Sequence, residues 1–316
     1  MIEAKTLLIV GAGASVPYGY PTGYALREEL CDRYELGNLK NIGIHSTEIE
    51  LFCHHFEASQ LNSIDAFLAK RGDDRIGNSN GGFNPAYRGF GTYADCGKLA
   101  IADQLMRCES IESLIKSKED HWLQYLWNLM VGDVPTAEFQ NNQLKIISFN
   151  YDRVIEQYFQ TVLENSYGID YKEASKLRKA IEIVHVYGNL QDLDVRAYGA
   201  KPANLTDVAA CIRVIPEDRE ANDVQFEKAK EMIAWADKIC FIGFGFDVTN
   251  MRRLGFPDHD LAGKKMDSTR YGMHEPEANF AQKLVGTQFC NDVTFNDSYS
   301  GAMTLEYIRQ TGFFIQ

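Results

Sequence analysis

The sequence has 316 residues, with 44 acidic and 32 basic side chains and a formal net charge of −12 at pH 7. So acidic a chain is poorly suited to nucleic acid, whose binding depends on Lys and Arg neutralising phosphates. Its seven cysteines are all at least twelve positions apart, which excludes a local CxxC metal or redox pair and disfavours a disulfide framework. There is no stretch of about 18 apolar residues and no signal-peptide pattern, so we expect a cytoplasmic protein without membrane contact or a metal site.

Short apolar runs rich in Ile and Val recur along the chain, and helical patterns separate most of them. Because these runs are nearly continuous rather than alternating, they are typical of strands covered on both faces in a parallel sheet. The pattern predicts an α/β fold with a Rossmann-like, doubly wound, mostly parallel sheet. The expected strands are Leu7–Val10, Lys145–Phe149, Glu182–Val186, Cys211–Ile215, Lys238–Phe244 and Asp292–Phe295.

Between about residues 37 and 140 the strand pattern stops and helical spacing replaces it, in Glu48–Phe56, Ser63–Lys70 and Tyr93–Met130. We therefore expect a single domain over residues 1–316 with a helical insertion at 37–140. Two polar stretches, residues 71–84 and about 255–277, predict loops.

The first predicted strand runs into a GAGAS turn at residues 11–15, which has the first two glycines of GxGxxG but Val16 at the third. Two interpretations are open: glycine permits a tight turn on steric grounds alone, or it lets the backbone approach a pyrophosphate. A second glycine-containing segment, with Thr22, precedes a predicted helix over residues 24–34. Its loop N–H groups favour the phosphate interpretation.

Polar side chains also follow later predicted strands, at the edge where ligands bind in open α/β sheets. The Asn150 amide can hold a ribose hydroxyl and a water, whereas Asp152 either joins this site or caps the next helix. His185 ends the third predicted strand and is either a satisfied core residue or part of the same edge. Asp247 and Asn250 either hold ribose hydroxyls or cap a helix.

Four strand ends in this order resemble the sirtuin-like family, in which a GAGxS turn, an Asn-x-Asp strand end, a histidine–glycine turn and a glycine-rich strand end surround NAD. The corresponding segments are Gly11–Ser15, Asn150–Asp152, His185–Asn189 and Gly243–Asn250, and the resemblance spans about residues 6–255. Leu61–Leu68 also resembles a helix frequent in the bacterial branch of the family.

Two departures bear on the branch. Deacylating sirtuins carry a four-cysteine zinc module, and this sequence has no CxxC pair. The family places a histidine directly before the turn glycine, where this sequence has Tyr187, with His185 two residues earlier. Since residues i and i+2 of a strand share a face, His185 can point to the same side as Tyr187. Two interpretations of the general base therefore remain open: His185 supplies it, or the pocket has no base.

The resemblance implies an NAD glycohydrolase of the bacterial antiphage-defence branch, which cleaves NAD to nicotinamide and ADP-ribose without a metal. In this interpretation Asn150 orients the ribose and the water, His185 accepts a proton, and Asp152 orients Asn150 or stabilises developing charge. The residues expected to contact NAD are Gly11, Ala12, Gly13, Ser15, Thr22, Tyr187, Gly188, Asn189, Gly243, Gly245, Asp247 and Asn250.

The resemblance also implies defence by NAD depletion, a homo-oligomer built partly through the helical insertion, and an activating partner such as a hexameric ATPase. The main alternative is a module that senses NAD or ADP-ribose without turnover, which Tyr187 at the usual base position favours. A protein deacylase is disfavoured by the missing zinc module. A hydride-transferring dehydrogenase is disfavoured by Val16.

Overall fold

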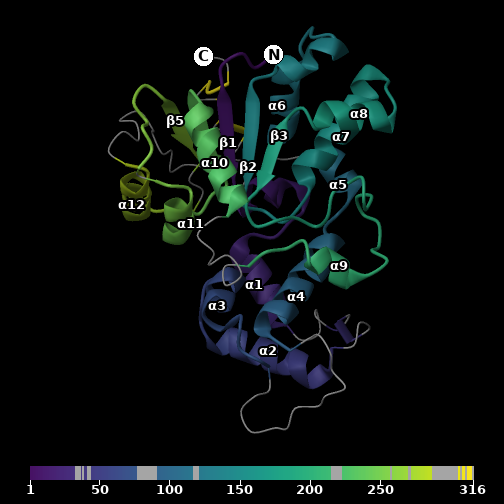
Figure 1. Ribbon diagram of the computed structural model, residues 1–316, viewed down its shortest axis with the longest axis vertical. Helices are drawn as coiled ribbons and strands as arrows, with labels where there is room; N and C mark the ends of the chain where they lie inside the picture. The colour runs from purple at the N-terminus through teal and green to yellow at the C-terminus, as the bar shows by residue number, and fades with distance from the viewer. Residues whose placement is uncertain are drawn as a thin grey trace.

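The computed structural model describes residues 1–32, 37, 39–40, 44–76, 91–116, 121–214, 223–256, 258–269, 272–286, 305–306, 308–309 and 312–314. At the centre of these residues is a five-stranded parallel sheet in the order β3–β2–β1–β4–β5 (Figure 1). The strands are β1 (Thr6–Val10), β2 (Leu144–Ser148), β3 (Glu182–His185), β4 (Lys238–Ile242) and β5 (Lys265–Ser268). The predicted Rossmann-like α/β fold class is confirmed.

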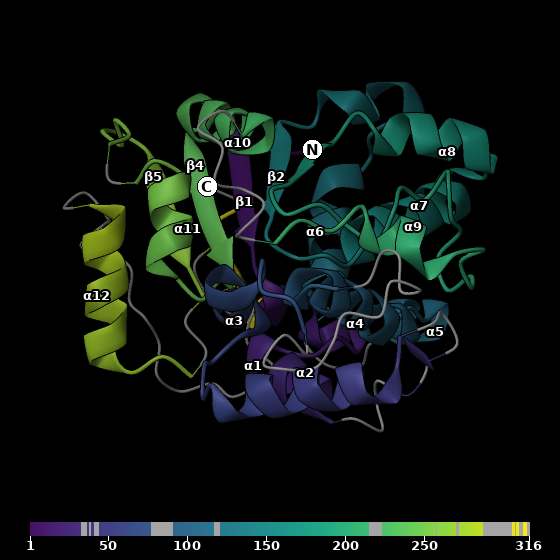
Figure 2. The same ribbon diagram turned by 60° about the horizontal axis from the view of Figure 1, so that its bottom comes forward.

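The central strand β1 pairs in parallel with both β2 and β4. All of its residues are buried, which is why its sequence is continuously apolar. The helices that flank the sheet are α6 (Trp122–Val131), α7 (Val154–Tyr167), α8 (Tyr171–Arg178), α10 (Val224–Trp235), α11 (Val248–Arg253) and α12 (Glu275–Val285) (Figures 1 and 2). None of the helices in the described ranges is both long and apolar enough to cross a bilayer.

A second group of helices packs together beyond the carboxyl ends of the strands, at the bottom of Figure 1. We call it the helical lobe; it contains α1 (Gly23–Cys31), α2 (Ser46–Ala58), α3 (Ile64–Arg71), α4 (Tyr93–Arg107) and α9 (Leu205–Ala209). Three short elements complete the description: α5 (Ile111–Ile115) follows α4 in the chain, η1 (Ala12–Tyr18) follows β1, and η3 (Thr136–Asn141) precedes β2. The lobe overlaps the predicted insertion, but α1 and α9 come from outside that range and α6 packs on α7 instead.

Four predicted strands are confirmed as β1, β2, β3 and β4. The prediction over Cys211–Ile215 is wrong for its described residues: Ile212 makes only an isolated bridge to Gly188, in a turn after α9. The polar loop predicted at 255–277 contains β5, a short edge strand. The strand predicted at Asp292–Phe295 and most of the loop predicted at 71–84 lie outside the described residues.

β2 and β3 lie on one side of β1, whereas β4 and β5 lie on the other side. The order of the strands in the sheet therefore reverses between β1 and β4. Here the loop after β1 contacts the loop after β4 backbone to backbone. A Cβ on Gly11 would lie 2.6 Å from the Gly243 carbonyl oxygen, and one on Gly13 would lie 2.8 Å from the Gly243 Cα. Gly243 itself has φ +58°, a conformation that favours glycine. The steric interpretation of these glycines is therefore sufficient to explain them.

This contact predicts that Gly243→Ala destabilises the fold by about 2 kcal/mol or more, because its Cβ would meet the Ala14 nitrogen at 2.1 Å. Gly245, in the same loop, is the matched control, since nothing lies within 4 Å of a Cβ added there. Urea unfolding of both variants measures the difference. Equal stability of the two variants would show that the loop contact is not tight.

Candidate functional site

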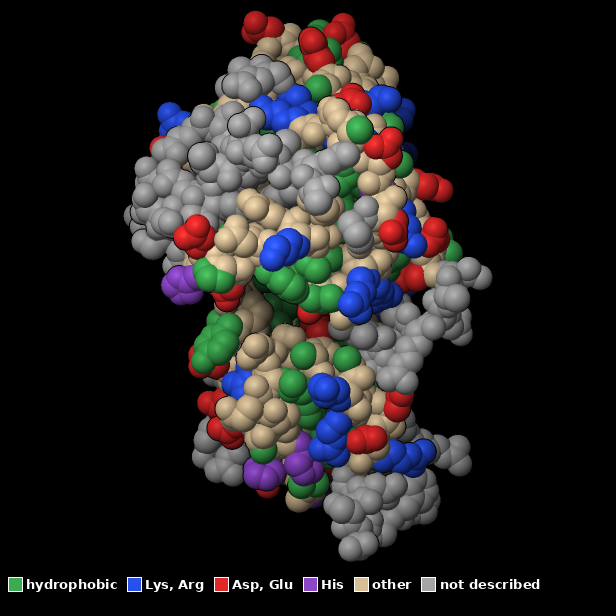
Figure 3. All heavy atoms as spheres, turned by 90° about the vertical axis from the view of Figure 1, so that its left-hand side faces the viewer, with side chains coloured by type: hydrophobic (Ala, Val, Ile, Leu, Met, Phe, Trp, Pro, Cys, Tyr) green, Lys and Arg blue, Asp and Glu red, His purple; other side chains and the backbone are tan. Residues whose placement is uncertain are grey.

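The place between β1 and β4 where the strand order reverses is the topological switch point of the sheet. A cavity of about 460 Å³ lies there, between the carboxyl ends of β1, β2 and β4 and the helical lobe. Figure 3 shows a hollow at the waist of the molecule, between the sheet above and the lobe below. In open α/β sheets this crevice is where ligands bind, and the volume suits a small molecule. We call it the switch-point pocket.

Three capped helices begin at the wall of this pocket. Thr22 caps α1 by accepting from the Ala25 N–H, and Ser63 caps α3 by accepting from the Ala66 N–H. Asp247 caps α11 by accepting from the N–H groups of Thr249 and Asn250, so the capping interpretation of Asp247 is confirmed. The first-turn N–H groups that these caps leave unused lack intrahelical partners and are available to anions.

Asn150 follows β2 and lines the pocket, and its side-chain amide joins two other parts of the chain. Its Nδ2 donates to the Gly11 carbonyl (3.0 Å) and to the Ser15 hydroxyl (3.1 Å), which uses both of its N–H groups. Among the described residues no donor contacts its Oδ1. Because Asn150 lines the pocket, this oxygen is available to accept a hydrogen bond from a ligand hydroxyl.

Ser15 joins Asn150 to Asp152. Its hydroxyl accepts from the Asn150 amide and donates to the Asp152 carboxylate. Asp152 also accepts from the Val154 N–H at 3.0 Å, so it supports the start of α7 as well as lining the pocket. Burial raises the pKa of Asp152 to about 6, although the Ser15 hydroxyl and the Val154 N–H oppose this rise. A carboxylate with such a pKa is suited to accepting a proton near neutral pH.

The pocket is acidic and aromatic. Three carboxylates, those of Asp65, Asp152 and Asp247, belong to its wall, whereas no Lys or Arg is found among the described residues that line it. Tyr151 donates to Asp65 at 2.9 Å and thereby links the loop after β2 to α3 of the helical lobe. Burial raises the pKa of Asp65. The remaining wall includes the rings of Tyr20, Phe149, Tyr151, Phe244 and Phe246.

The structure brings most of the predicted site residues together at this pocket. The predicted residues that line it are Gly11, Ala12, Gly13, Thr22, Asn150, Asp152, Gly243, Gly245, Asp247 and Asn250. Ser15 lies behind Asn150. Residues not singled out from the sequence also line it, among them Tyr20, Ser63, Asp65, Phe149, Tyr151, Phe244, Phe246, Thr269 and Met273. The family-like helix segment Leu61–Leu68 was the signal that could have identified Ser63 and Asp65.

His185 is not brought into this pocket. Its ring lies between the Asn150 main-chain carbonyl (Nδ1, 2.8 Å) and the Glu156 carboxylate (Nε2, 2.5 Å). It lines a separate cavity of about 430 Å³ beside β3, α7 and α8. Because both ring nitrogens already have hydrogen-bond partners and the ring lines another cavity, the imidazole is not available to take a proton from a ligand in the switch-point pocket.

The other residues of the predicted histidine–glycine turn also lie outside the pocket wall. The Tyr187 hydroxyl donates to Asn250 Oδ1 at 2.6 Å and accepts from Arg253 at 3.0 Å, so it positions a pocket residue from behind. Gly188 has φ +73° and pairs with Ile212; its missing Cβ would overlap the Cys211 carbonyl. Asn189 lines the same cavity as His185.

The main-chain N–H groups of the GAGAS turn are largely used inside the protein. Gly11 donates to the Ile242 carbonyl, Gly13 to the Gly243 carbonyl and Ala14 to the Gly11 carbonyl, at 2.9–3.1 Å. This turn therefore has little capacity left for a pyrophosphate. The first turn of α1, with Thr22 and Gly23 in the pocket wall, offers N–H groups instead.

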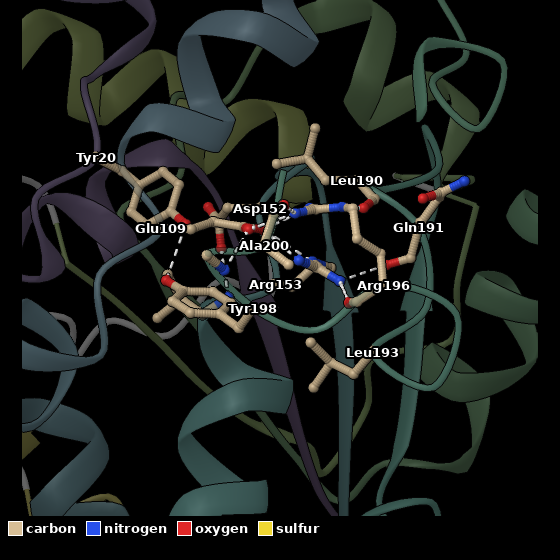
Figure 4. Close-up of polar contacts among 12 residues, drawn as sticks. Tyr20, Glu109, Asp152, Arg153, Leu190, Gln191, Leu193, Arg196, Tyr198 and Ala200 are labelled. Atoms are coloured by element: carbon tan, nitrogen blue, oxygen red, sulfur yellow. Dashed lines mark hydrogen bonds and ion pairs between the residues drawn. The ribbon is translucent and has the colours of Figure 1, made fainter. Parts of the chain in front are cut away.

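A buried ionic cluster supports the pocket from behind (Figure 4). The Glu109 carboxylate, with a fully buried side chain, accepts from Arg153, Arg196 and the Gly199 N–H at 2.6–2.9 Å. Beside this cluster, Tyr198 and Tyr20 join through their hydroxyls at 2.9 Å. Arg153 directly follows Asp152, and both Asp152 and Tyr20 line the pocket. The cluster and the tyrosine pair therefore hold these two parts of the pocket wall in place.

No protein-family model and no curated protein sequence matches this chain.

Replacing Asp152 by Asn should stabilise the protein at about pH 8 by about 3 kcal/mol, because the folded state holds the pKa of this carboxyl above its ordinary value and so opposes ionisation. The penalty is absent below the unfolded pKa, grows as the pH rises, and is complete above the folded pKa of about 6. Urea unfolding at about pH 4 and about pH 8 measures it. An equal effect at both pH values would contradict this explanation.

Glu109→Gln should destabilise the protein by about 3–5 kcal/mol, because it leaves the buried guanidinium groups of Arg153 and Arg196 without their counter-charge. Glu112→Gln is the control: this side chain is exposed and, among the described residues, pairs with the exposed Lys116, a contact of the kind that contributes little. Thermal and urea unfolding compare the two variants. A loss no greater for Glu109 than for Glu112 would rule out the supporting role.

Proposed function

We propose that this chain binds NAD in the switch-point pocket and hydrolyses the bond between ribose C1′ and nicotinamide. The observation that carries the proposal is the Asn150–Ser15–Asp152 relay, in which an open amide oxygen and a carboxylate with a pKa of about 6 line one pocket. His185, one of the two interpretations that the sequence left open for the base, has no catalytic role in this proposal. Asp152 takes that role.

The pocket chemistry supports such a ligand. The nicotinamide ring of NAD is a cation, which the carboxylates of Asp65, Asp152 and Asp247 attract. Aromatic side chains in the wall offer stacking surfaces to the two bases. The pyrophosphate would be held by the first-turn N–H groups of α1, because no described lining residue is basic. An acidic wall disfavours ligands that carry more phosphate than this.

The hydrolysis needs little acid catalysis, because nicotinamide leaves as a neutral molecule. The C1′–N bond breaks with its electron pair going to the ring nitrogen, and positive charge develops on the ribose. The Asp152 carboxylate stabilises that charge and accepts a proton from the water whose oxygen bonds to C1′. Asn150 Oδ1 accepts from a ribose hydroxyl and fixes the sugar. The products are ADP-ribose, nicotinamide and one proton.

Incubation of the purified protein with NAD should release free nicotinamide, detected by chromatography, and both Asn150→Ala and Asp152→Asn should reduce turnover by about 100-fold or more. Both variants should remain folded, as near-UV circular dichroism will check. Asp133→Asn, on the α6–η3 turn and outside the pocket, is the control. Full turnover in either pocket variant would exclude that residue from the chemistry.

A second candidate is binding of NAD or ADP-ribose without turnover. It is favoured by one observation: no histidine is found among the described residues of the pocket wall, and Tyr187 at the usual base position is tied to Asn250. Calorimetric titration with ADP-ribose distinguishes the two functions. Binding that Asn150→Ala weakens, with no nicotinamide released, would support the sensor.

The defence role, the homo-oligomer and an activating partner such as an ATPase remain part of this proposal, on the resemblance alone. Because unregulated loss of NAD would harm the host cell, a nearly inactive isolated chain that gains turnover with a partner is compatible with hydrolysis. The nicotinamide assay should therefore be run across a range of protein concentrations, which tests activation by self-association.

A further inference from the structure

The imidazole of His185 lies between two hydrogen-bond acceptors. Nδ1 faces the Asn150 main-chain carbonyl at 2.8 Å and Nε2 faces the Glu156 carboxylate at 2.5 Å, and both side chains are nearly buried. A carbonyl oxygen and an ionised carboxylate can only accept. Both contacts are therefore satisfied together only when the His185–Glu156 pair holds a proton on each ring nitrogen.

The Asn150 peptide is held by His185 and by Ser148. The Asn150 N–H donates to the Ser148 hydroxyl at 3.1 Å, and that hydroxyl donates to the Asn150 carbonyl at 3.4 Å, a longer contact than the 2.8 Å from His185 Nδ1. The strand pairing places Ser148 opposite His185. The amide side chain of Asn150 then reaches the Gly11 carbonyl and Ser15. The His185 ring, which lines one cavity, thus holds the main chain of Asn150, which lines the other.

We propose that the His185–Glu156 pair is a positioning device, which holds Asn150 in place for the ligand from outside the switch-point pocket and releases it when the imidazolium loses its proton. The proposal deepens, and in its turnover readout rests on, the proposed hydrolysis. His185 is a positioning residue, not a catalytic one.

Deprotonation must break one of the two contacts. With Glu156 ionised, the remaining proton stays on Nε2, and the bare Nδ1 then faces the Asn150 carbonyl, which is repulsive. Burial alone would lower the pKa of His185, but Glu156 and the Asn150 carbonyl outweigh it and the pKa is raised; that of Glu156 is lowered by His185 despite its burial. The release therefore occurs above the ordinary His pKa of about 6.5.

Other charges also act on the pair. Asp152 lies close enough to raise the pKa of His185, and Arg178 acts on Glu156 from α8. The other charged groups that line the cavity are Arg153, Lys179, Glu182, Asp192 and Lys228. Of these, Lys179 is paired with Asp194, and Lys228 with Glu182. The direct partner Glu156 is therefore the group to change.

The deciding variant is Glu156→Gln. Its amide can donate to Nε2, so a neutral imidazole keeps its proton on Nδ1 and keeps its bond to Asn150. The wild type should lose turnover by about tenfold as the pH rises through the His185 pKa, whereas Glu156→Gln should change by less than about twofold. Glu164→Gln, two turns further along α7 and bonded to Gln160, should retain the wild-type profile.

The profile separates positioning from catalysis. A general base at residue 185 would need its neutral form, so turnover would keep rising with pH above about 7, where the carboxylate of Asp152 is already ionised, and that result would overturn the proposal. An alkaline loss that persists unchanged in Glu156→Gln would overturn it as well. Loss of turnover in Asn150→Ala combined with no pH effect of His185 would leave the hydrolysis standing and reject the device.

Nitrogen-15 NMR tests the device even if the protein does not cleave NAD. Both ring nitrogens of His185 should be protonated at about pH 6.5, and the side-chain amide signal of Asn150 should shift with the same midpoint as His185. In Glu156→Gln the Asn150 signal should no longer follow the pH. A His185 titration that leaves the Asn150 amide unmoved in the wild type would reject the proposal independently of any activity.

Discussion

The backbone contact between the loop after β1 and the loop after β4 determines where the pocket lies. Gly11 and Gly13 lie so close to Gly243 that a Cβ on any of them would overlap main-chain atoms of the other loop. This closes the sheet edge between the two central strands, and the Gly11 carbonyl that it fixes is the acceptor for the Asn150 amide. The pocket wall is therefore an outcome of chain packing between the loops after β1 and β4.

Most of the sheet could be predicted from the sequence, because its inner strands are buried on both faces and their apolar runs are continuous. The failures have a physical reason. Ile212 and Val214 are apolar because they belong to the buried core, although the described part of the segment predicted at Cys211–Ile215 forms only an isolated bridge. The strand β5 (Lys265–Ser268) was not predicted because it has only four residues, two of them charged. Its pairing with β4 leaves no pattern in the sequence.

The site was predictable at the strand ends and not beyond them. Asn150 and Asp152 reach the pocket because the carboxyl ends of parallel strands share one edge. His185 was placed by the rule that alternate residues share a face, but β3 ends at His185, so Tyr187 lies past the strand and the rule does not apply. Nothing in the sequence shows that Glu156, in the first turn of α7, would take the imidazole into another cavity.

The carboxylate-rich wall has a consequence for turnover under the proposed function. Before the bond breaks, the ring of the bound dinucleotide is a cation among Asp65, Asp152 and Asp247; afterwards it is neutral nicotinamide. The electrostatic attraction that draws the ring in disappears in the same event that frees it. Departure of the first product would then need no opening motion, and a rigid pocket braced by Glu109 and its two arginines would serve as well as a mobile one.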